Sequence, residues 1–306
     1  MEKDLSIVIP LYNEASIISV LLEDLQNVLE ATNFSFEVIL VDDGSNDHSR
    51  LILREMISKF SWLRVLNLSR NFGQHAAINA GLQSAEGNMI VVMDGDLQDS
   101  PETILKLVKE LNSGFDMVLV DRTNRKVSRL YSISQRLFYY ILNLLSDLQF
   151  DPRFGNFSII TRKVLEAYLS LNGAIVYYPA ALRWLGFKFS TITSEQQNRS
   201  TGSKSKYSLK KRLNLAGSII LSHSIKPLRV SIVIGIFISL TGFLAILFFM
   251  YLYLKGSITD TGWPSVIISI YFFSGVQLSC LGVYGLYLGS IYEKIQKKPI
   301  FIIDLP

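Results

Sequence analysis

A group of oxygen-bearing side chains directly follows a short apolar run. Asp94-Gly95-Asp96-Leu97-Gln98-Asp99 comes after residues 88–93, a run typical of a buried central strand. Carboxylates gathered at a strand end repel one another and lose hydration, so we expect a cation between them. Carboxylate and amide oxygens suit Mg²⁺ or Mn²⁺, and such ions usually also bind substrate phosphates. The alternative is a solvated acidic turn that starts the helix expected at 101–113.

The elements that must position this cluster recur at intervals that suit a parallel sheet with helical crossovers. We therefore expect an α/β doubly wound fold, in which ligands bind beyond the carboxyl ends of the strands. The sequence has no Gly-x-Gly-x-x-Gly after the first strand and no Gly-x-x-x-x-Gly-Lys, which disfavours dinucleotide and P-loop sites. The expected strands are 5–9, 37–41, 63–68, 89–93 and 116–120, and the expected helices are 15–31, 47–60, 74–84 and 101–113.

Composition divides the chain into a mixed globular part and an apolar part. The mean hydropathy is +0.30 and charged residues make up only 18%, which is too apolar for an ordinary soluble enzyme. The apolar excess is concentrated in two segments, since 230–254 and 264–292 contain no charged residue. Each segment is long enough to cross a bilayer. We therefore predict transmembrane helices at 228–254 and 264–292, joined by an external turn at 255–263.

The charges that flank these segments predict their orientation. The stretch from Arg199 to Arg229 contains several basic residues and no acidic one, and Lys294, Lys297 and Lys298 follow the second apolar segment. The positive-inside rule then places residues 1–227 and the tail at 293–306 in the cytoplasm, at the inner membrane. A net charge of +4 and a pI near 9.0 could indicate a protein that binds nucleic acid. Because the clustered positive charge borders the apolar segments, we expect anionic lipid instead, and no nucleic acid partner.

Two further segments are amphipathic. Residues 130–147 are rich in aromatic side chains and predict either a core-packing helix or a helix lying on the membrane surface. Residues 206–227 are the stronger candidate for a juxtamembrane helix, because the first apolar segment follows them directly.

Four motifs recur after the expected strands: Pro10-Leu11-Tyr12-Asn13-Glu14, Val41-Asp42-Asp43-Gly44-Ser45, Arg70-Asn71-Phe72-Gly73 and Asp94-Gly95-Asp96-Leu97-Gln98. In order and spacing they resemble the family-2 glycosyltransferases, which have the GT-A fold. More narrowly, the chain looks like the polyprenyl-phosphate glycosyltransferases, a group that includes the dolichol-phosphate mannose synthases and the bacterial GtrB-like and ArnC-like enzymes. The two C-terminal apolar segments fit the bacterial members.

The resemblance implies a role for each matching residue of the expected GT-A domain, residues 1–205. One set would hold the nucleotide sugar, a second would ligate Mg²⁺ or Mn²⁺ at the diphosphate, and a third would bind the acceptor phosphate. Asp96, Arg122 and Arg199 are expected to take part in catalysis. The nucleotide-sugar set is Pro10, Tyr12, Glu14, Val41, Asp43, Gly95 and Arg122; the metal set is Asp94, Asp96 and Gln98; the acceptor set is Arg199, Lys204 and Lys206.

Structural roles remain open for several of these residues. Arg122 could form an ion pair with Asp121 or with the Asp94 cluster, and Arg199 with the nearby lysines could simply flank the membrane. Asp42 is expected to cap the following helix rather than to contact a ligand. The run from Arg199 to Tyr207 is one residue longer than the family pattern. Lys204 and Lys206 therefore compete for one role, and Lys206 is favoured by its place beside Tyr207.

The expected activity is inverting transfer of a hexose from a nucleotide sugar to a polyprenyl phosphate, with a UDP-sugar and undecaprenyl phosphate favoured. Such a product would feed pathways that build or modify cell-envelope glycans. A lipid phosphate is already anionic and needs no general base, unlike a sugar hydroxyl. The alternatives are a GDP-mannose-dependent mannose synthase and a catalytically silent scaffold or lipid-flipping partner. The resemblance also implies a homo-oligomer, which is a tetramer in some relatives.

Overall fold

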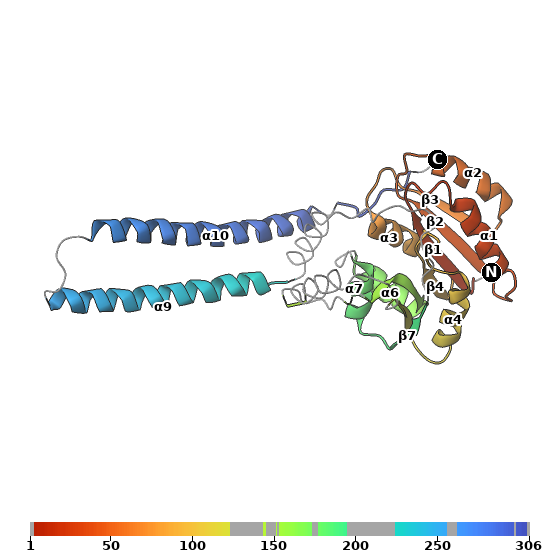
Figure 1. Ribbon diagram of the computed structural model, residues 1–306. Coiled ribbons are helices and arrows are strands. Elements are labelled where there is room, and N and C mark those ends of the chain that lie inside the picture. The colour runs from red at the N-terminus through yellow and green to blue at the C-terminus, as the bar shows by residue number, and fades with distance from the viewer. Residues whose placement is uncertain are drawn as a thin grey trace. The chain divides into compact units, whose positions relative to one another are not determined.

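The computed structural model describes residues 3–122, 143–144, 151, 153–172, 177–194, 224–255, 262–296 and 298–304. Two compact units divide these residues (Figure 1). The first, the sheet domain, contains the described residues of 1–139, 149–206 and 299–306; the second, the helical unit, contains those of 140–148 and 207–298. Most of the amphipathic stretch expected at 130–147, and residues 206–223 of the next one, lie outside the described residues.

The strands and helices expected from hydrophobic periodicity are confirmed up to residue 121. Beyond that point the sheet domain contains elements that periodicity did not predict, namely β6, α6, α7 and β7. The bounds are β1 Leu5–Leu11, α1 Ile18–Leu29, β2 Phe36–Asp42, α2 Ser49–Lys59, β3 Leu63–Asn67, α3 Gln74–Ser84, β4 Met89–Val92, α4 Glu102–Leu111, β5 Met117–Asp121, β6 Phe154–Thr161, α6 Arg162–Ser170, α7 Tyr178–Leu185, β7 Phe189–Thr193, α9 Lys226–Leu254 and α10 Trp263–Ile295.

The sheet has the strand order β3-β2-β1-β4-β6-β5-β7. The pairs β1–β2, β1–β4, β2–β3 and β5–β7 are parallel, whereas β6 lies antiparallel between β4 and β5. A register shift between Leu119 and Asp121 lets the end of β5 bend against the start of β6. Because β6 runs in the opposite direction, its first residues lie beside the carboxyl ends of β4 and β5.

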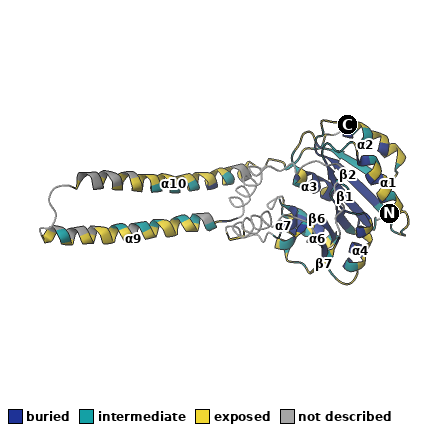
Figure 2. Cartoon of the chain, in the orientation of Figure 1, coloured by how far each residue is buried: buried dark blue, intermediate teal, exposed yellow. Residues whose placement is uncertain are grey.

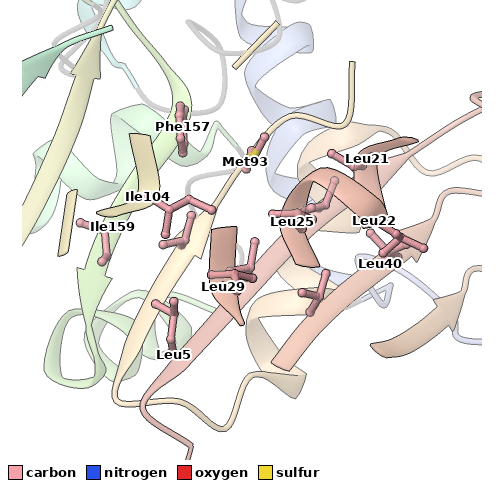
Figure 3. Close-up of a cluster of buried hydrophobic side chains, with 14 of the residues drawn as sticks. Leu5, Leu21, Leu22, Leu25, Leu29, Leu40, Met93, Ile104, Phe157 and Ile159 are labelled. Carbon is pink, nitrogen blue, oxygen red and sulfur yellow. The ribbon is translucent and has the colours of Figure 1, made fainter. Parts of the chain in front are cut away.

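Helices cover both faces of the sheet. Helices α1, α2 and α4 pack on one face, where their apolar stripes meet alternate strand residues such as Leu5, Leu40 and Ile159 (Figure 3). Helices α3, α6 and α7 pack on the other face. The central strands are buried on both sides (Figure 2), which accounts for their nearly continuous apolar sequence. This packing holds the loops at the carboxyl ends of the strands on a rigid base.

The helical unit contains two long apolar helices. Helices α9 and α10 both meet the length and composition needed to cross a membrane, through the windows Leu228–Ala245 and Phe272–Tyr292. Their described side chains are largely exposed (Figure 2). Within this unit the Tyr287 hydroxyl donates a hydrogen bond to the Ser224 carbonyl at 2.6 Å. The assignment of these helices to a membrane stays a prediction.

The C-terminal segment pairs with the edge of the sheet instead of lying free as a tail. Ile303 forms an antiparallel bridge with Leu68, just beyond β3. The Ser69 amide donates to the Ile302 carbonyl at 2.9 Å. Residues 302–304 accordingly lie beside the end of β3 and contact Arg50 of α2 in the sheet domain (Figure 1).

Candidate functional site

The acidic cluster begins where β4 ends and follows a tightly packed path. Gly95 packs closely against β1. A side chain would not fit here, because a β-carbon would clash with the Leu11 side chain and lie 3.1 Å from Ile9 Cγ2. Leu97 has a φ of 56°, which lies in the left-handed region. The Gln98 backbone amide donates a hydrogen bond to Asp96 Oδ1 at 3.2 Å. The turn therefore presents Asp94, Asp96 and Gln98 from one short segment.

Asp94 is held by donors from three separate parts of the sheet domain. Gln74 Nε2, at the start of α3, donates to Asp94 Oδ1 at 2.8 Å, and Asn156 Nδ2, in β6, donates to the same oxygen at 2.9 Å. Arg122 Nη2, just after β5, donates to Asp94 Oδ2 at 3.1 Å. These bonds fix the orientation of the carboxylate before any ligand binds.

Arg122 connects Asp94 to Asp99, the last residue of the cluster. Its Nη2 forms an ion pair with each carboxylate, and the Arg122 side chain is only 12% exposed. Burial opposes the positive charge, but the attraction of Asp94 and Asp99 outweighs it and raises the pKa of Arg122. The guanidinium fits here only because residue 155 is glycine, since a β-carbon there would lie 2.6 Å from Arg122 Cζ. The arginine therefore stays charged at the carboxyl end of the sheet, as an ion pair with the cluster.

The donor set fits a hard divalent cation. Asp94, Asp96 and Gln98 offer carboxylate and amide oxygens, the ligands that Mg²⁺ and Mn²⁺ prefer. Among the described residues, no group of three His, Cys, Asp or Glu side chains is placed to hold a metal ion. Two carboxylates and one amide would leave coordination positions for water and phosphate oxygens. The set is therefore suited to a metal shared with a substrate, and not to a closed structural site.

Asp43 organises the loop at 70–73. Its Oδ1 accepts a hydrogen bond from the Phe72 amide at 2.7 Å, and its Oδ2 accepts one from the Gly73 amide at 2.9 Å. Burial raises the pKa of Asp43, while these two amides act in the opposite direction. The loop is further fixed by Gly44, whose φ is +67° and whose β-carbon would lie 2.6 Å from the Asn71 nitrogen. Only glycine fits where these two loops touch.

Asp42 does not cap α2, contrary to the sequence-based expectation. The residue before α2 is His48, which makes no side-chain cap hydrogen bond. Asp42 instead accepts a hydrogen bond from the Ser45 amide at 3.2 Å and forms an ion pair with Arg50 Nε at 2.8 Å. Asp42 is fully buried, so the arginine from the first turn of α2 neutralises a charge that a simple cap would have left unpaired.

The remaining residues predicted for the nucleotide side follow β1 and β2. Pro10 pairs with Val41 across these two strands. Tyr12 and Glu14 follow β1 and are half-buried, and the Glu14 amide donates to Ser49 Oγ at 3.1 Å. Their parallel strands end at the same edge of the sheet as β4. Their roles toward a nucleotide stay predictions, and Arg199, Lys204 and Lys206 lie outside the described residues.

Sequence reasoning missed the contacts that Gln74 and Asn156 make with Asp94. Asn156 belongs to the stretch 154–158, which none of the four motifs includes. Gln74 directly follows the Arg70–Gly73 motif, and this was its only signal. The sequence around Gln74 and Asn156 does not reveal that their side-chain amides bind Asp94.

His75 is a half-buried neighbour of this site. Burial lowers its pKa to about 4, although the charge of Asp94 acts in the opposite direction. Its ring meets Tyr177 edge-on with centroids 5.0 Å apart. Within the described part of the chain, His75 Nδ1 is buried without a hydrogen-bond partner. The imidazole therefore carries no charge at neutral pH and packs as a polar aromatic ring.

Comparison with known proteins gives a consistent family match. The model of the family described as "Glycosyl transferase family 2" matches residues 6–169. The "Uncharacterized glycosyltransferase YkcC" of Bacillus subtilis (strain 168) is 37% identical over 98% of this chain and 93% of its own length. The "Bactoprenol glucosyl transferase" of Shigella phage SfII is 32% identical over 98% of this chain and 97% of its own length.

Solved structures also resemble the chain. Glucosyl-3-phosphoglycerate synthase from Mycobacterium tuberculosis, in complex with phosphoglyceric acid, superposes with a TM-score of 0.47 at 17% identity. The match covers 72% of this chain and 78% of that protein.

Proposed function

The chain belongs to glycosyl transferase family 2, and on that premise we propose that it transfers a hexose from a nucleotide sugar to a polyprenyl phosphate. It is a glycosyltransferase with the GT-A fold. The acceptor is supported by full-length similarity to the phage bactoprenol glucosyl transferase and by the two helices suited to a membrane. A UDP-sugar is the favoured donor and undecaprenyl phosphate the favoured acceptor.

One observation carries the proposal: Asp94 is held by Gln74, Asn156 and Arg122 at the carboxyl end of the sheet, with Asp96 and Gln98 in the same turn. This is where ligands bind in doubly wound sheets. A carboxylate oriented in advance costs little reorganisation when a charged ligand arrives.

In this proposal the predicted residues bind the two parts of the donor, its diphosphate and its nucleotide. Asp94, Asp96 and Gln98 would hold Mg²⁺ or Mn²⁺, which when bound stabilises the negative charge on the leaving nucleoside diphosphate. Arg122 adds a buried positive charge beside the same group. Pro10, Tyr12, Glu14, Gly95 and the backbone of Val41 would line the nucleotide, and Asp43 would support it through the loop at 70–73.

The acceptor side needs positive charge and no general base. A lipid phosphate is already ionised at neutral pH, so its difficulty is to approach a diphosphate of like charge. Arg199 and either Lys204 or Lys206 would supply the attraction, because arginine and lysine bind phosphate through charge-assisted hydrogen bonds. The two apolar helices would anchor this basic stretch at the inner membrane, with the sheet domain in the cytoplasm.

The test is turnover by the full-length protein in detergent. Undecaprenyl phosphate is added with a panel of UDP- and GDP-sugars, and nucleoside diphosphate release and the lipid product are measured with and without Mn²⁺. We expect metal-dependent product from one donor, and loss of at least 100-fold in Asp96→Asn. Asp24→Asn, an exposed carboxylate on α1, is the matched control and should keep full activity.

Three outcomes would contradict parts of this proposal. A GDP-sugar as the sole productive donor would replace the favoured nucleotide. Binding of nucleotide sugars without turnover on any lipid phosphate would favour a silent scaffold. Full activity in Asp96→Asn would rule out the metal assignment.

A further inference from the structure

The segment that follows the second apolar helix belongs to the sheet domain. Helix α10 ends at Ile295, and residues 299–304, which we call the C-terminal edge segment, cluster with the sheet domain. This segment adds antiparallel pairing at the outer side of β3, through the bridge between Leu68 and Ile303. The residues next to β3 thus gain backbone partners that an edge strand otherwise leaves to water.

A side-chain network reinforces the pairing. The Asp304 amide donates to the Asn67 carbonyl at 2.7 Å. Arg50, in α2, donates through Nη2 to the Leu68 carbonyl at 2.6 Å and through Nη1 to Asp304 Oδ2 at 3.3 Å. The same guanidinium pairs with the buried Asp42 at 2.8 Å. One arginine therefore links the end of β2, the residues after β3 and the C-terminal edge segment.

The paired residues lead directly into the loop that Asp43 organises. The Ser69 amide donates to the Ile302 carbonyl, and the next residues form the loop at 70–73, whose amides bind Asp43. Gly44 packs against the same loop. The C-terminal edge segment holds one side of this loop, and Asp43 holds the other.

We propose that the C-terminal edge segment is a positioning element for the nucleotide site: by pairing with residues 67–69 it keeps the loop at 70–73, and with it Asp43, in the conformation that binds the donor nucleotide. This role rests on the proposed function. It also means that the chain leaving the second apolar helix is fastened to the domain that binds the donor. Only residues 296–298 separate α10 from this segment, so the sheet domain is covalently connected both to the residues that precede α9 and to those that follow α10.

The experiment uses the full-length protein in detergent and two variants. A chain ending at Lys298 removes the segment. Asp304→Pro keeps the chain length but removes both the amide that donates to Asn67 and the carboxylate that accepts from Arg50. Ile302→Ser is the matched control, because the Ile302 side chain is 52% exposed and its carbonyl, which accepts from Ser69, remains. Amide hydrogen exchange is followed in residues 69–73 and, as a check on global folding, in β1. UDP and GDP affinities are measured by calorimetry with Mn²⁺.

Both altered variants should show at least tenfold faster exchange at residues 69–73 with β1 unchanged, and threefold to tenfold weaker binding of the nucleoside diphosphate. The control should match the unaltered protein in both measurements. Unchanged exchange at 69–73 in Asp304→Pro and in the shortened chain would overturn the proposal, as would faster exchange without any loss of affinity. If the unaltered protein bound neither UDP nor GDP, the proposed function would fail instead, because the exchange measurement needs no nucleotide.

Discussion

Gly155 offers the sharpest test of how the site is built. A β-carbon at this position would lie 2.6 Å from Arg122 Cζ, whereas carbon atoms in ordinary contact are about 3.5–4.0 Å apart. In Gly155→Ala the guanidinium must therefore retreat by about 1 Å. Arg122 Nη2, which lies 3.1 Å from Asp94 Oδ2, would then be about 4 Å away, beyond hydrogen-bond distance.

The cost follows from the kind of bond that is lost. A hydrogen bond to a charged group contributes about 1.5–3 kcal/mol, and about 1.4 kcal/mol corresponds to a factor of ten. We therefore expect Gly155→Ala to lower kcat/KM by roughly 10- to 100-fold. Because the same hydrogen bond stabilises the folded sheet domain, the thermal unfolding midpoint should also fall, by about 3–10 °C.

A double-mutant cycle separates this effect from general damage. Steady-state release of nucleoside diphosphate is measured for Gly155→Ala, for Arg122→Ala and for the double variant. If the alanine acts by displacing the guanidinium, it should cost nothing further once Arg122 is absent. Gly282→Ala is the control, since a β-carbon there meets nothing within 4 Å and the residue lies outside the left-handed region. Equal losses from Gly155→Ala in both backgrounds would refute the reasoning.

Three more predictions concern the loops and buried groups around the site. Gly44→Ala should lower the free energy of unfolding by about 2 kcal/mol or more, because alanine is strained at this left-handed position and its β-carbon clashes with the loop at 70–73. Gly114→Ala has the left-handed strain without the clash, so denaturant titration should show a smaller loss for it. Equal losses would contradict the steric explanation. Gln74→Ala and Asn156→Ala each remove a hydrogen-bond donor to Asp94. Each should raise the Mn²⁺ concentration needed for half-maximal binding several-fold, as measured by Mn²⁺ paramagnetic resonance. Unchanged titrations would show that these side-chain amides do not orient the carboxylate. Burial lowers the pKa of His75 from 6.5 to about 4, so the unfolded chain binds more protons than the folded chain between these pH values. The free energy of unfolding should therefore fall by about 2 kcal/mol from pH 7 to pH 5. In His75→Gln the unfolding midpoint should depend less on pH, and an identical pH profile would exclude His75 as the cause.

The local features of the site were predictable from the sequence. Apolar runs with period-2 or buried-strand character identified β1 to β5, and the intervening amphipathic stretches identified α1 to α4. Because parallel strands end at one edge of a sheet, the acidic cluster and Arg122 could be assigned to a common edge. The structural alternative for Arg122, an ion pair with the Asp94 cluster, matches the geometry.

Contacts between distant segments were not predictable in this way. The β6 strand lies antiparallel between β4 and β5, and no local pattern states which strands it will join. Asn156 and Asp94 are 62 residues apart in sequence. The expectation that Asp42 caps a helix failed for a different reason, because the capping rule considers backbone amides and Asp42 pairs with the Arg50 side chain instead.

The sequence by itself determined which segments up to residue 121 form strands and helices, that an oxygen-rich turn ends a central strand, and that two apolar segments follow a basic stretch. These features depend on local periodicity and composition. Only the tertiary structure decided that Gly155 and Asn156 lie against Arg122 and Asp94, and that residues 302–304 return to the edge of β3. Strand partners are selected by matching buried faces and backbone donors across long separations. Arg50 and Asp304, which are 254 residues apart, meet only when that selection has been made.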